Sequence, residues 1–196
     1  MSCLTVATKN PGKLREIREI LGSEARLLSL ADFPDVGDIV EDGRTFEANA
    51  IKKALAVASQ TGHVSLADDS GLEVDALDGA PGVYSARFAG EKATDEQNNR
   101  KLLRLLEDVP DAQRTARFRC VIAVGAPDGS VQTAEGTAEG RILHSPRGTG
   151  GFGYDPLFLV SGLRRTFAEL PSEEKNRISH RGNALRSAYS MLSQFL

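Results

Sequence analysis

The stretch Val64-Ser65-Leu66-Ala67-Asp68-Asp69-Ser70-Gly71 joins a short apolar run to two consecutive carboxylates. The apolar residues predict a buried strand, and Gly71 predicts a turn that leaves room for a ligand. Because adjacent carboxylates are costly to bury together, a divalent cation is a natural way to keep both ionised. A solvated turn rich in Asp, Ser and Gly is the alternative. The rest of the chain favours the rim of a metal-assisted active site.

Helical and strand patterns alternate on both sides of this stretch. Thr45 and Gly62 are placed to cap a helix before it, and Thr94 with Gln97 forms a capping box after it. The sequence predicts strands at 4–7, 64–67, 117–124 and 131–143, and helices from 11, over 46–61, from 95 to about 108, and from about 179. This alternation predicts an α/β fold with a mixed β-sheet and flanking helices.

Composition narrows the class of protein. The chain has 196 residues, 40% of them hydrophobic, which suits one domain over residues 1–196. Its 24 basic and 27 acidic side chains give a net charge of −3, so nothing favours binding to a nucleic-acid backbone. Cys3 and Cys120 lack zinc-site spacing, and no apolar run approaches the ~20 residues that cross a bilayer. We expect a soluble cytoplasmic protein with reduced thiols that binds neither nucleic acid nor membrane.

The loop Thr8-Lys9-Asn10-Pro11-Gly12-Lys13 predicts a phosphate-binding helix start. Asn10 suits the N-cap and Pro11 the first helical position. Free amides, the positive end of the helix dipole and two lysines together suit phosphate oxygens. The loop is not a Walker motif, because the glycine spacing and the Lys-Ser/Thr pair are missing. A capped surface helix with solvated lysines is the alternative.

Two further residues extend this cationic and acidic set. Lys53 lies four residues after Asn49 on the predicted second helix, so both project from one face. Taken alone, a charged helix face would be the default explanation of these two residues. Glu41 precedes that helix. It would complete an oxygen-rich site for Mg²⁺, which prefers one or two carboxylates together with phosphate oxygens and water.

The glycine-rich segment at residues 148–153 has the spacing of a dinucleotide-binding fingerprint. Tyr154-Asp155-Pro156 follows at once, where that motif requires a helix, so we reject this interpretation. A glycine loop that holds Phe152 beside Asp155 suits closure over a flat ring by stacking. The alternative is a turn whose Phe152 fills the core.

A polar cluster, Lys175, Ser179, His180 and Arg181, lies near the start of the last predicted helix. His180 and Arg181 carry donors that would address a carbonyl oxygen on a ligand. A surface pair at a helix terminus is the alternative.

Taken together, these residues resemble the inosine triphosphatase family, the pyrophosphatases of non-canonical purine nucleoside triphosphates. The blocks that carry the resemblance span nearly the whole chain: 8–13, 45–46, 49–50, 53–54, 67–72, 79–87, 148–156 and 179–182. One departure is Ala48, where an acidic residue is expected in many members. This departure affects only the need for a secondary carboxylate near the metal, because Glu47 is adjacent and Glu41 matches the family.

The resemblance implies one nucleoside triphosphate pyrophosphatase domain over residues 1–196. Its expected fold is an elongated mixed sheet with flanking helices and two lobes around a central substrate cleft. Its expected activity is the Mg²⁺-dependent hydrolysis of ITP, dITP and XTP to the nucleoside monophosphate and pyrophosphate. A homodimer is also implied.

The resemblance also assigns roles by position. Asp69 is the expected catalytic base, and Glu41 and Asp69 are the expected metal ligands, with Asp68 as a further candidate. Substrate binding is assigned to Thr8, Lys9, Asn10, Pro11, Gly12, Lys13 and Lys53 on the phosphate side, to Ser70, and to Phe152, Gly153, Tyr154, Asp155, Lys175, His180 and Arg181 on the base side.

Base selection has a physical basis. Inosine and xanthosine present a 6-oxo acceptor where adenine presents a 6-amino donor, so a donor from His180 or Arg181 would favour the first two.

Two other functions compete with this one. A regulatory module would bind the nucleotide without hydrolysis, but it would gain little from Asp68, Asp69 and Glu41 beside a triphosphate. A septum-inhibitor-type pyrophosphatase for modified pyrimidines is disfavoured by the His180-Arg181 block.

Overall fold

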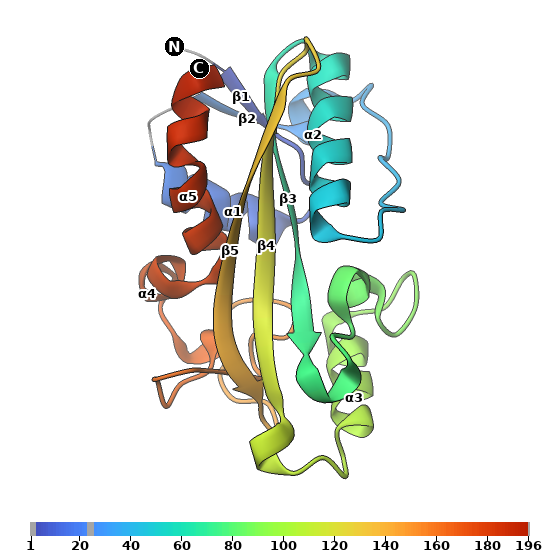
Figure 1. Ribbon diagram of the computed structural model, residues 1–196, viewed down its shortest axis with the longest axis vertical. Coiled ribbons are helices and arrows are strands. Elements are labelled where there is room, and N and C mark those ends of the chain that lie inside the picture. Colours follow the sequence, from blue (N-terminus) through green and yellow to red (C-terminus); the bar gives the residue numbers. More distant parts are fainter. Residues whose placement is uncertain (1–2, 23–25, 196) are drawn as a thin grey trace. The chain divides into compact units, whose positions relative to one another are not determined.

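The computed structural model describes residues 3–22 and 26–195 (Figure 1). Its strands form one six-stranded sheet in the order β2-β1-β3-β4-β5-β6. β1 pairs in parallel with β2 and β3, whereas β5 pairs antiparallel with β6, so the predicted mixed sheet is confirmed. The strands are β1 (Cys3–Val6), β2 (Arg26–Ser29), β3 (Val64–Val74), β4 (Thr115–Gly125), β5 (Val131–Ile142) and β6 (Phe158–Val160). The α-helices are α1 (Pro11–Leu21), α2 (Phe46–Thr61), α3 (Asp95–Leu105), α4 (Ser172–Ile178) and α5 (His180–Phe195).

The chain divides into two compact units. Unit 1 comprises 1–69, 120–136 and 181–196, and unit 2 comprises 70–119 and 137–180. The three longest strands, β3, β4 and β5, each contribute residues to both units. The expectation of one catalytic domain over the whole chain stays a prediction.

Unit 1 packs helices on both faces of its strands. Ile17 of α1 and Leu185 of α5 are buried against Leu66 of β3 and Ile122 of β4. α2 covers the opposite face, where a Cβ added to Gly125 of β4 would lie 3.3 Å from Ala54. The period of two in a strand therefore sends alternate side chains of β3 toward α1 and α5 or toward α2.

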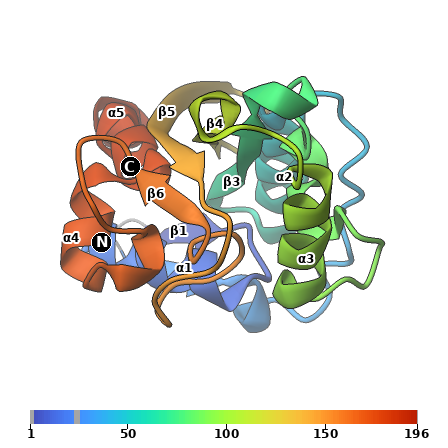
Figure 2. The same cartoon turned by 90° about the horizontal axis from the view of Figure 1, so that it is seen from below.

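Unit 2 has a core rich in aromatic rings. Figure 2 shows α3 and α4 on opposite sides of its strands. The rings of Phe118 and Phe158 pack edge to face with centroids 4.7 Å apart, and Phe158 and Phe167 stack at 5.1 Å. Leu72 and Leu102 close this cluster from β3 and α3.

Local sequence explains the starts of three helices. Asn10 accepts hydrogen bonds from the first turn of α1, and Thr45 accepts from the amide of Ala48 in α2. Thr94 and Gln97 form the predicted capping box of α3. These starts are confirmed. α3 ends at Leu105 rather than near 108.

The central expectation about β3 is wrong. The sequence predicted that the strand ends before Asp68 and that Gly71 forms a turn, but β3 continues to Val74 through both carboxylates. Strands β2 and β6 and helix α4 are short and were not predicted. Among residues 3–22 and 26–195, no helix is both long enough and apolar enough to cross a membrane.

Candidate active site

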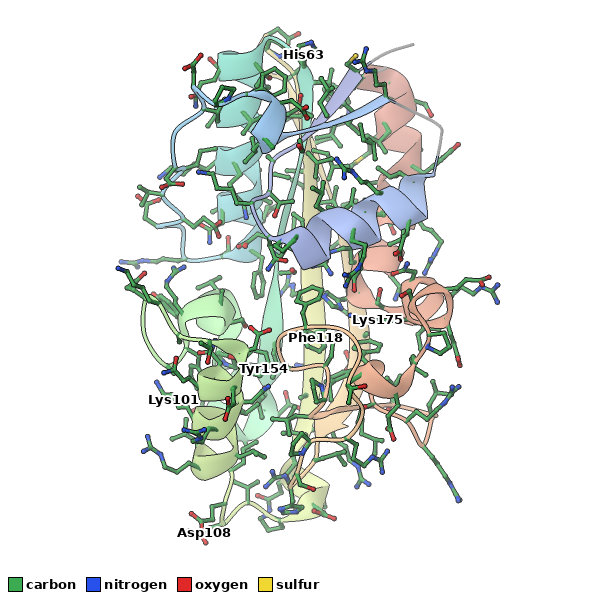
Figure 3. The ribbon with its side chains drawn as sticks, turned by 180° about the vertical axis from the view of Figure 1, so that it is seen from behind. His63, Lys101, Asp108, Phe118, Tyr154 and Lys175 are labelled. Atoms are coloured by element: carbon green, nitrogen blue, oxygen red, sulfur yellow. The ribbon has the colours of Figure 1, made fainter. Side chains whose placement is uncertain are left out.

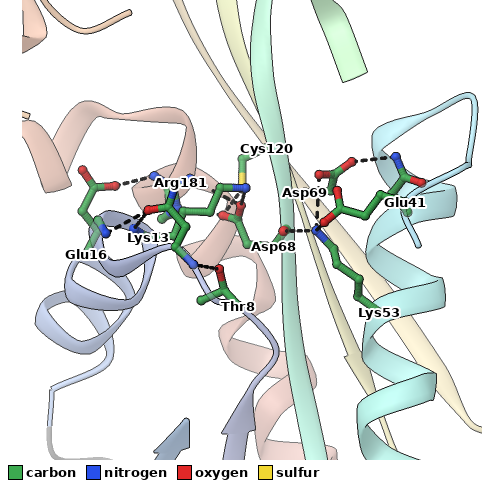
Figure 4. Close-up of polar contacts among 12 residues, drawn as sticks. Thr8, Lys13, Glu16, Glu41, Lys53, Asp68, Asp69, Cys120 and Arg181 are labelled. Carbon is green, nitrogen blue, oxygen red and sulfur yellow. Dashed lines mark hydrogen bonds and ion pairs between the residues drawn. The ribbon is translucent and has the colours of Figure 1, made fainter. Parts of the chain in front are cut away.

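Asp68 and Asp69 lie side by side on β3 but face opposite sides of the strand (Figure 4). Both are buried, with 1% and 5% of their surfaces exposed. The Asp68 carboxylate meets Lys13 and Arg181, whereas the Asp69 carboxylate meets Lys53. The premise that these carboxylates crowd together and need one cation is therefore wrong, because each has its own positively charged neighbours.

The face that carries Asp69 joins two carboxylates at one ammonium group. Lys53 Nζ lies 3.3 Å from Asp69 Oδ1 and 3.2 Å from Glu41 Oε1, and it also donates to the carbonyl of Asp68 at 2.8 Å. Asn49 Nδ2 donates to Asp69 Oδ2 at 3.1 Å. Helix α2 supplies both Asn49 and Lys53, as the spacing of four residues predicted.

Glu41 and Asp69 are the side chains that would hold a divalent cation here. Burial raises the pKa of Asp69 and the nearby Glu41 carboxylate raises it further, while Lys53 opposes both effects. Two carboxylates that share one ammonium group match the protein ligands that Mg²⁺ uses when phosphate and water supply the other oxygens. Within the described ranges, no group of three or more His, Cys, Asp and Glu side chains gathers as an all-protein metal cage.

The opposite face of β3 holds a buried charge network. Arg181 Nε donates to Asp68 Oδ2 at 2.7 Å, and its Nη1 donates to Glu16 of α1. Lys13 Nζ lies 2.7 Å from Asp68 Oδ1, and the Cys120 thiol donates to Asp68 Oδ2 at 3.1 Å. Asp68 is therefore the shared counter-ion of Arg181 and Lys13 on this face, and its carboxylate points away from Glu41 and Asp69.

The charges of this network set its pKa values. Burial alone would raise the pKa of Asp68, but Arg181 and Lys13 hold it well below its usual range. Burial would lower the pKa of Arg181, and Asp68 and Glu16 raise it instead. For Cys120, burial and then the Asp68 carboxylate raise the thiol pKa. The carboxylate therefore stays ionised while the thiol stays protonated at neutral pH.

Residues 8–10 lead into the first turn of α1 as predicted, but most amides of the segment 8–13 already have a hydrogen-bond partner. The amides of Gly12 and Lys13 donate to Asn10 Oδ1 at 2.9 and 3.1 Å, and the Asn10 amide donates to Thr8 Oγ1 at 3.1 Å. Pro11 has no N–H to offer. Cationic character remains at Lys13 and at the exposed Lys9, which pairs with Asp38. Phosphate binding here would depend on lysines more than on free backbone donors.

Unit 2 brings together Phe152, Asp155 and Lys175 from the glycine loop and α4. Lys175 Nζ lies 2.5 Å from Asp155 Oδ2 and 4.9 Å from the centre of the Phe152 ring. The Phe152 amide donates to Asp155 Oδ2 at 3.0 Å. A Cβ at Gly151 would lie 2.0 Å from that oxygen, and Gly151 has φ of +72°, so the loop requires glycine there. Phe152 is half-buried at the loop.

Different contacts hold the other predicted residues of unit 2. The His180 ring stacks on Phe118 with centroids 4.7 Å apart and planes 12° apart. Tyr154 is buried and donates its hydroxyl to the carbonyl of Ser85 at 2.8 Å; Figure 3 labels Phe118, Tyr154 and Lys175. Ser70 lies on β3 directly after Asp69.

The glycine loop is held by residues that the sequence did not single out. Asp95 Oδ2 accepts from the amide of Gly153 at 2.7 Å, and Asn99 Nδ2 donates to the carbonyl of Gly153 at 2.9 Å. These two side chains lie four residues apart on α3. Their spacing was visible in the sequence, but nothing in it named their partner more than 50 residues away.

The structure thus sorts the predicted residues into two sets. Unit 1 holds the loop at 8–13 together with Glu41, Lys53, Asp68, Asp69 and Arg181, and unit 2 holds Ser70, Phe152, Gly153, Tyr154, Asp155, Lys175 and His180. Arg181 was expected on the base side with His180. Its described partners are instead Asp68 and Glu16 of unit 1, and these contacts do not support a base-reading role.

Comparison with known families and proteins agrees with this architecture. The Ham1 family matches residues 4–191. A protein named dITP/XTP pyrophosphatase from Geobacter sulfurreducens is 62% identical over 186 residues and covers 94% of each chain. One of the same name from Desulforamulus reducens is 58% identical over 192 residues, covering 97% of this chain and 96% of the relative.

Solved structures give the same result. A HAM1 protein from Coxiella burnetii has a TM-score of 0.89 and 45% identity, covering 99% of this chain and 100% of its own. The Ham1 protein of Staphylococcus aureus has a TM-score of 0.87 and 40% identity, with coverage of 98% and 99%. Both matches extend over the whole α/β architecture described above. The chain therefore belongs to the Ham1 family.

Proposed function

We propose that this protein hydrolyses dITP, XTP and ITP to the nucleoside monophosphate and pyrophosphate. The observation that carries the proposal is the buried Asp69 carboxylate, held between Lys53 and Asn49 with Glu41 at the same ammonium group. The relatives named dITP/XTP pyrophosphatase support the substrate class. A module that only binds nucleotides would have no use for a carboxylate oriented in this way.

In the proposed reaction, Asp69 acts as the general base. It accepts a proton from a water molecule whose oxygen attacks the α-phosphorus, the bond to the bridging oxygen breaks, and pyrophosphate leaves with the electron pair. Lys53 and Asn49 hold the two carboxylate oxygens, so the base is oriented before the substrate arrives. Lys13 and Lys53 would stabilise the negative charge that gathers on the leaving group.

We also propose that Mg²⁺ assists this reaction. Glu41 and Asp69 would hold the ion, which when bound would neutralise charge on the phosphate oxygens. Asp68 is not proposed as a ligand, because its carboxylate faces Arg181 and Lys13 on the other side of β3.

Base recognition is proposed to use unit 2. The half-buried Phe152 ring would stack on the purine, and the loop beneath it is fixed by Asp155 and Lys175. His180, stacked on Phe118, offers a ring donor for the 6-oxo group. The proposed activity on soluble nucleotides would place the protein in the cytoplasm, and we propose that it acts as a homodimer.

Product analysis tests this function. The protein is incubated with Mg²⁺ and, separately, dITP, XTP, ITP, dATP and dGTP, and the products are separated by ion-exchange chromatography. We expect monophosphate and pyrophosphate from the 6-oxo substrates dITP, XTP and ITP, and much slower turnover of dATP. Formation of the diphosphate with free phosphate would contradict the assignment.

A further inference from the structure

We propose that Asn49 and Gly43 form a positioning contact that holds Glu41 and Asp69 in their working arrangement. This inference rests on the proposed function for the roles of the two carboxylates. Asn49 would act through its neighbours and would contact neither substrate nor metal.

The Asn49 side chain binds two structures at once. It is fully buried, with 0% of its surface exposed. Its Nδ2 donates to Asp69 Oδ2 at 3.1 Å, while its Oδ1 accepts from the amide of Gly43 at 2.8 Å. Nδ2 also lies 3.4 Å from the carbonyl oxygen of Gly43. One amide group therefore joins the proposed base to the loop that carries Glu41.

Helix α2 makes this link rigid. Asn is a poor residue for a helix interior, because its side chain competes for backbone hydrogen bonds. At this position the side chain satisfies partners outside the helix instead. Lys53, one turn later, binds Asp69 Oδ1, so the two oxygens of Asp69 are held from two points on one helix face. Rotation of the carboxylate would break one contact or the other.

Gly43 is required by close approach. A Cβ added there would lie 2.5 Å from Asn49 Oδ1 and 3.1 Å from the Cβ of Ala48. Gly43 is not among the described glycines with positive φ, so the contact itself, and not the backbone conformation, excludes a side chain. Glu41 lies two residues before it and reaches to within 3.2 Å of Lys53 Nζ. Displacing Gly43 should therefore displace Glu41.

Two glycine variants in the same loop region test the contact without removing any charge. Gly43→Ala inserts a methyl group against Asn49, whereas Gly37→Ala is the matched control, because a Cβ at Gly37 meets nothing within 4 Å. Since a misplacement of about 1 Å can cost about 100-fold in rate, we expect Gly43→Ala to lower kcat by about 10- to 100-fold. We also expect it to raise the Mg²⁺ concentration for half-maximal rate by about tenfold, which a general loss of stability would not do. Gly37→Ala should match the wild type.

A second measurement does not depend on activity. Amide hydrogen exchange of residues 41–45 in the free protein should be faster in Gly43→Ala than in Gly37→Ala, while exchange within α2 stays unchanged. Asn49→Asp separates the two halves of the contact, because it keeps an acceptor for the Gly43 amide but loses the donor to Asp69. It should lower kcat while residues 41–45 stay protected.

The outcomes are distinct. Equal exchange, kcat and Mg²⁺ requirement in the two alanine variants would overturn the inference. If Asn49→Asp does not fold, Gly43→Ala decides alone. If the wild type fails to hydrolyse dITP and XTP, the proposed function fails, whereas the exchange comparison still decides whether Asn49 holds the loop.

Discussion

At the scale of single residues, Asp68 and Asp69 show that two neighbouring carboxylates of one strand can have different electrostatic surroundings. Arg181 and Lys13 overcome the cost of burying Asp68 and lower its pKa. For Asp69, burial raises the pKa, Lys53 lowers it and the Glu41 carboxylate raises it again, so the net shift is upward. The two neighbouring carboxylates therefore have opposite pKa shifts, and the raised pKa of Asp69 is the direction that its proposed role as a base requires.

Asp69→Asn should abolish most of the activity while the fold is kept. The amide has nearly the same shape but cannot take a proton and carries no charge for a cation. Loss of a general base costs about 10²- to 10⁴-fold in rate, and we expect kcat to fall at least that far. The measurement is pyrophosphate release from dITP at saturating Mg²⁺. A variant within tenfold of the wild type would show that Asp69 is neither base nor ligand.

Asp68→Asn should act on stability instead. Removing one partner from a buried ion pair costs about 3 kcal/mol or more, because Arg181 and Lys13 lose their shared counter-ion. The pKa of Asp68 is lowered by folding, so its contribution is present above the unfolded pKa of about 3.9 and is lost as pH falls through the lower folded value.

Urea unfolding from pH 3 to pH 6 checks this prediction. The free-energy gap between wild type and Asp68→Asn should be full at pH 6 and should shrink below about pH 4. A gap that stayed constant with pH would show that Asp68 is not ionised in the folded protein.

At the scale of elements, prediction from sequence succeeded where the cause is local. Three helices begin at a side chain that accepts a hydrogen bond from a backbone amide no more than three residues later: Asn10, Thr45, and Thr94 with Gln97. The local sequence is therefore enough to predict these starts. The course of β3 was not, because Asp-Asp-Ser-Gly is typical of a turn and only distant cations make it a buried strand. Arg181, Lys13 and Lys53 supply those cations from other elements.

The candidate site divides in the same way. Unit 1 keeps together the residues that the sequence grouped on the phosphate and metal side: Asp69, Glu41, Lys53 and the loop at 8–13. Arg181 and His180, which the sequence grouped on the base side, contact different residues. These neighbours in sequence belong to different units, with Arg181 at the beginning of α5 directed to Glu16 and Asp68. No pattern in the sequence names such a partner, since Glu16 is 165 residues away.

Helix α3 should control the glycine loop through Asp95 and Asn99. Each makes one hydrogen bond to Gly153, and a hydrogen bond is worth about 1 kcal/mol. Asp95→Ala and Asn99→Ala should each raise KM for dITP about fivefold by loosening the loop that carries Phe152. The exposed Arg104 of the same helix provides the control variant, Arg104→Ala, which should leave KM unchanged. Unchanged KM in all three variants would show that the loop needs no support from α3.

At the scale of the whole molecule, the exposed Tyr84 is the clearest candidate for a covered surface. Its side chain, in the 3-10 helix at Gly82–Arg87, is 57% exposed. A single exposed aromatic ring is common on a monomer, so the homodimer itself is proposed from the family resemblance, and Tyr84 marks one surface where the partner would pack. Sedimentation at micromolar concentration should therefore give about twice the chain mass of 21.0 kDa.

Two tyrosine variants locate that interface. Tyr84→Asp should shift the protein toward the monomer, because a charge would have to be buried against the partner. Tyr189 of α5 is 50% exposed and serves as the control, so Tyr189→Asp should sediment like the wild type. A monomer at every accessible concentration would contradict the proposed homodimer.

The course of β3 through Asp68 and Asp69 has a consequence for how the gene can change length. In a pleated strand, insertion or deletion of one residue before position 68 turns every following side chain to the other face. A deletion would bring Asp69 to Arg181 and Lys13 and would leave Ser70 facing Lys53, whereas an insertion would bring Asp68 to Lys53. Frame-preserving changes of a single codon here should be lost from a library selected for activity, although the loop before α2, for example near Gly37, should accept them.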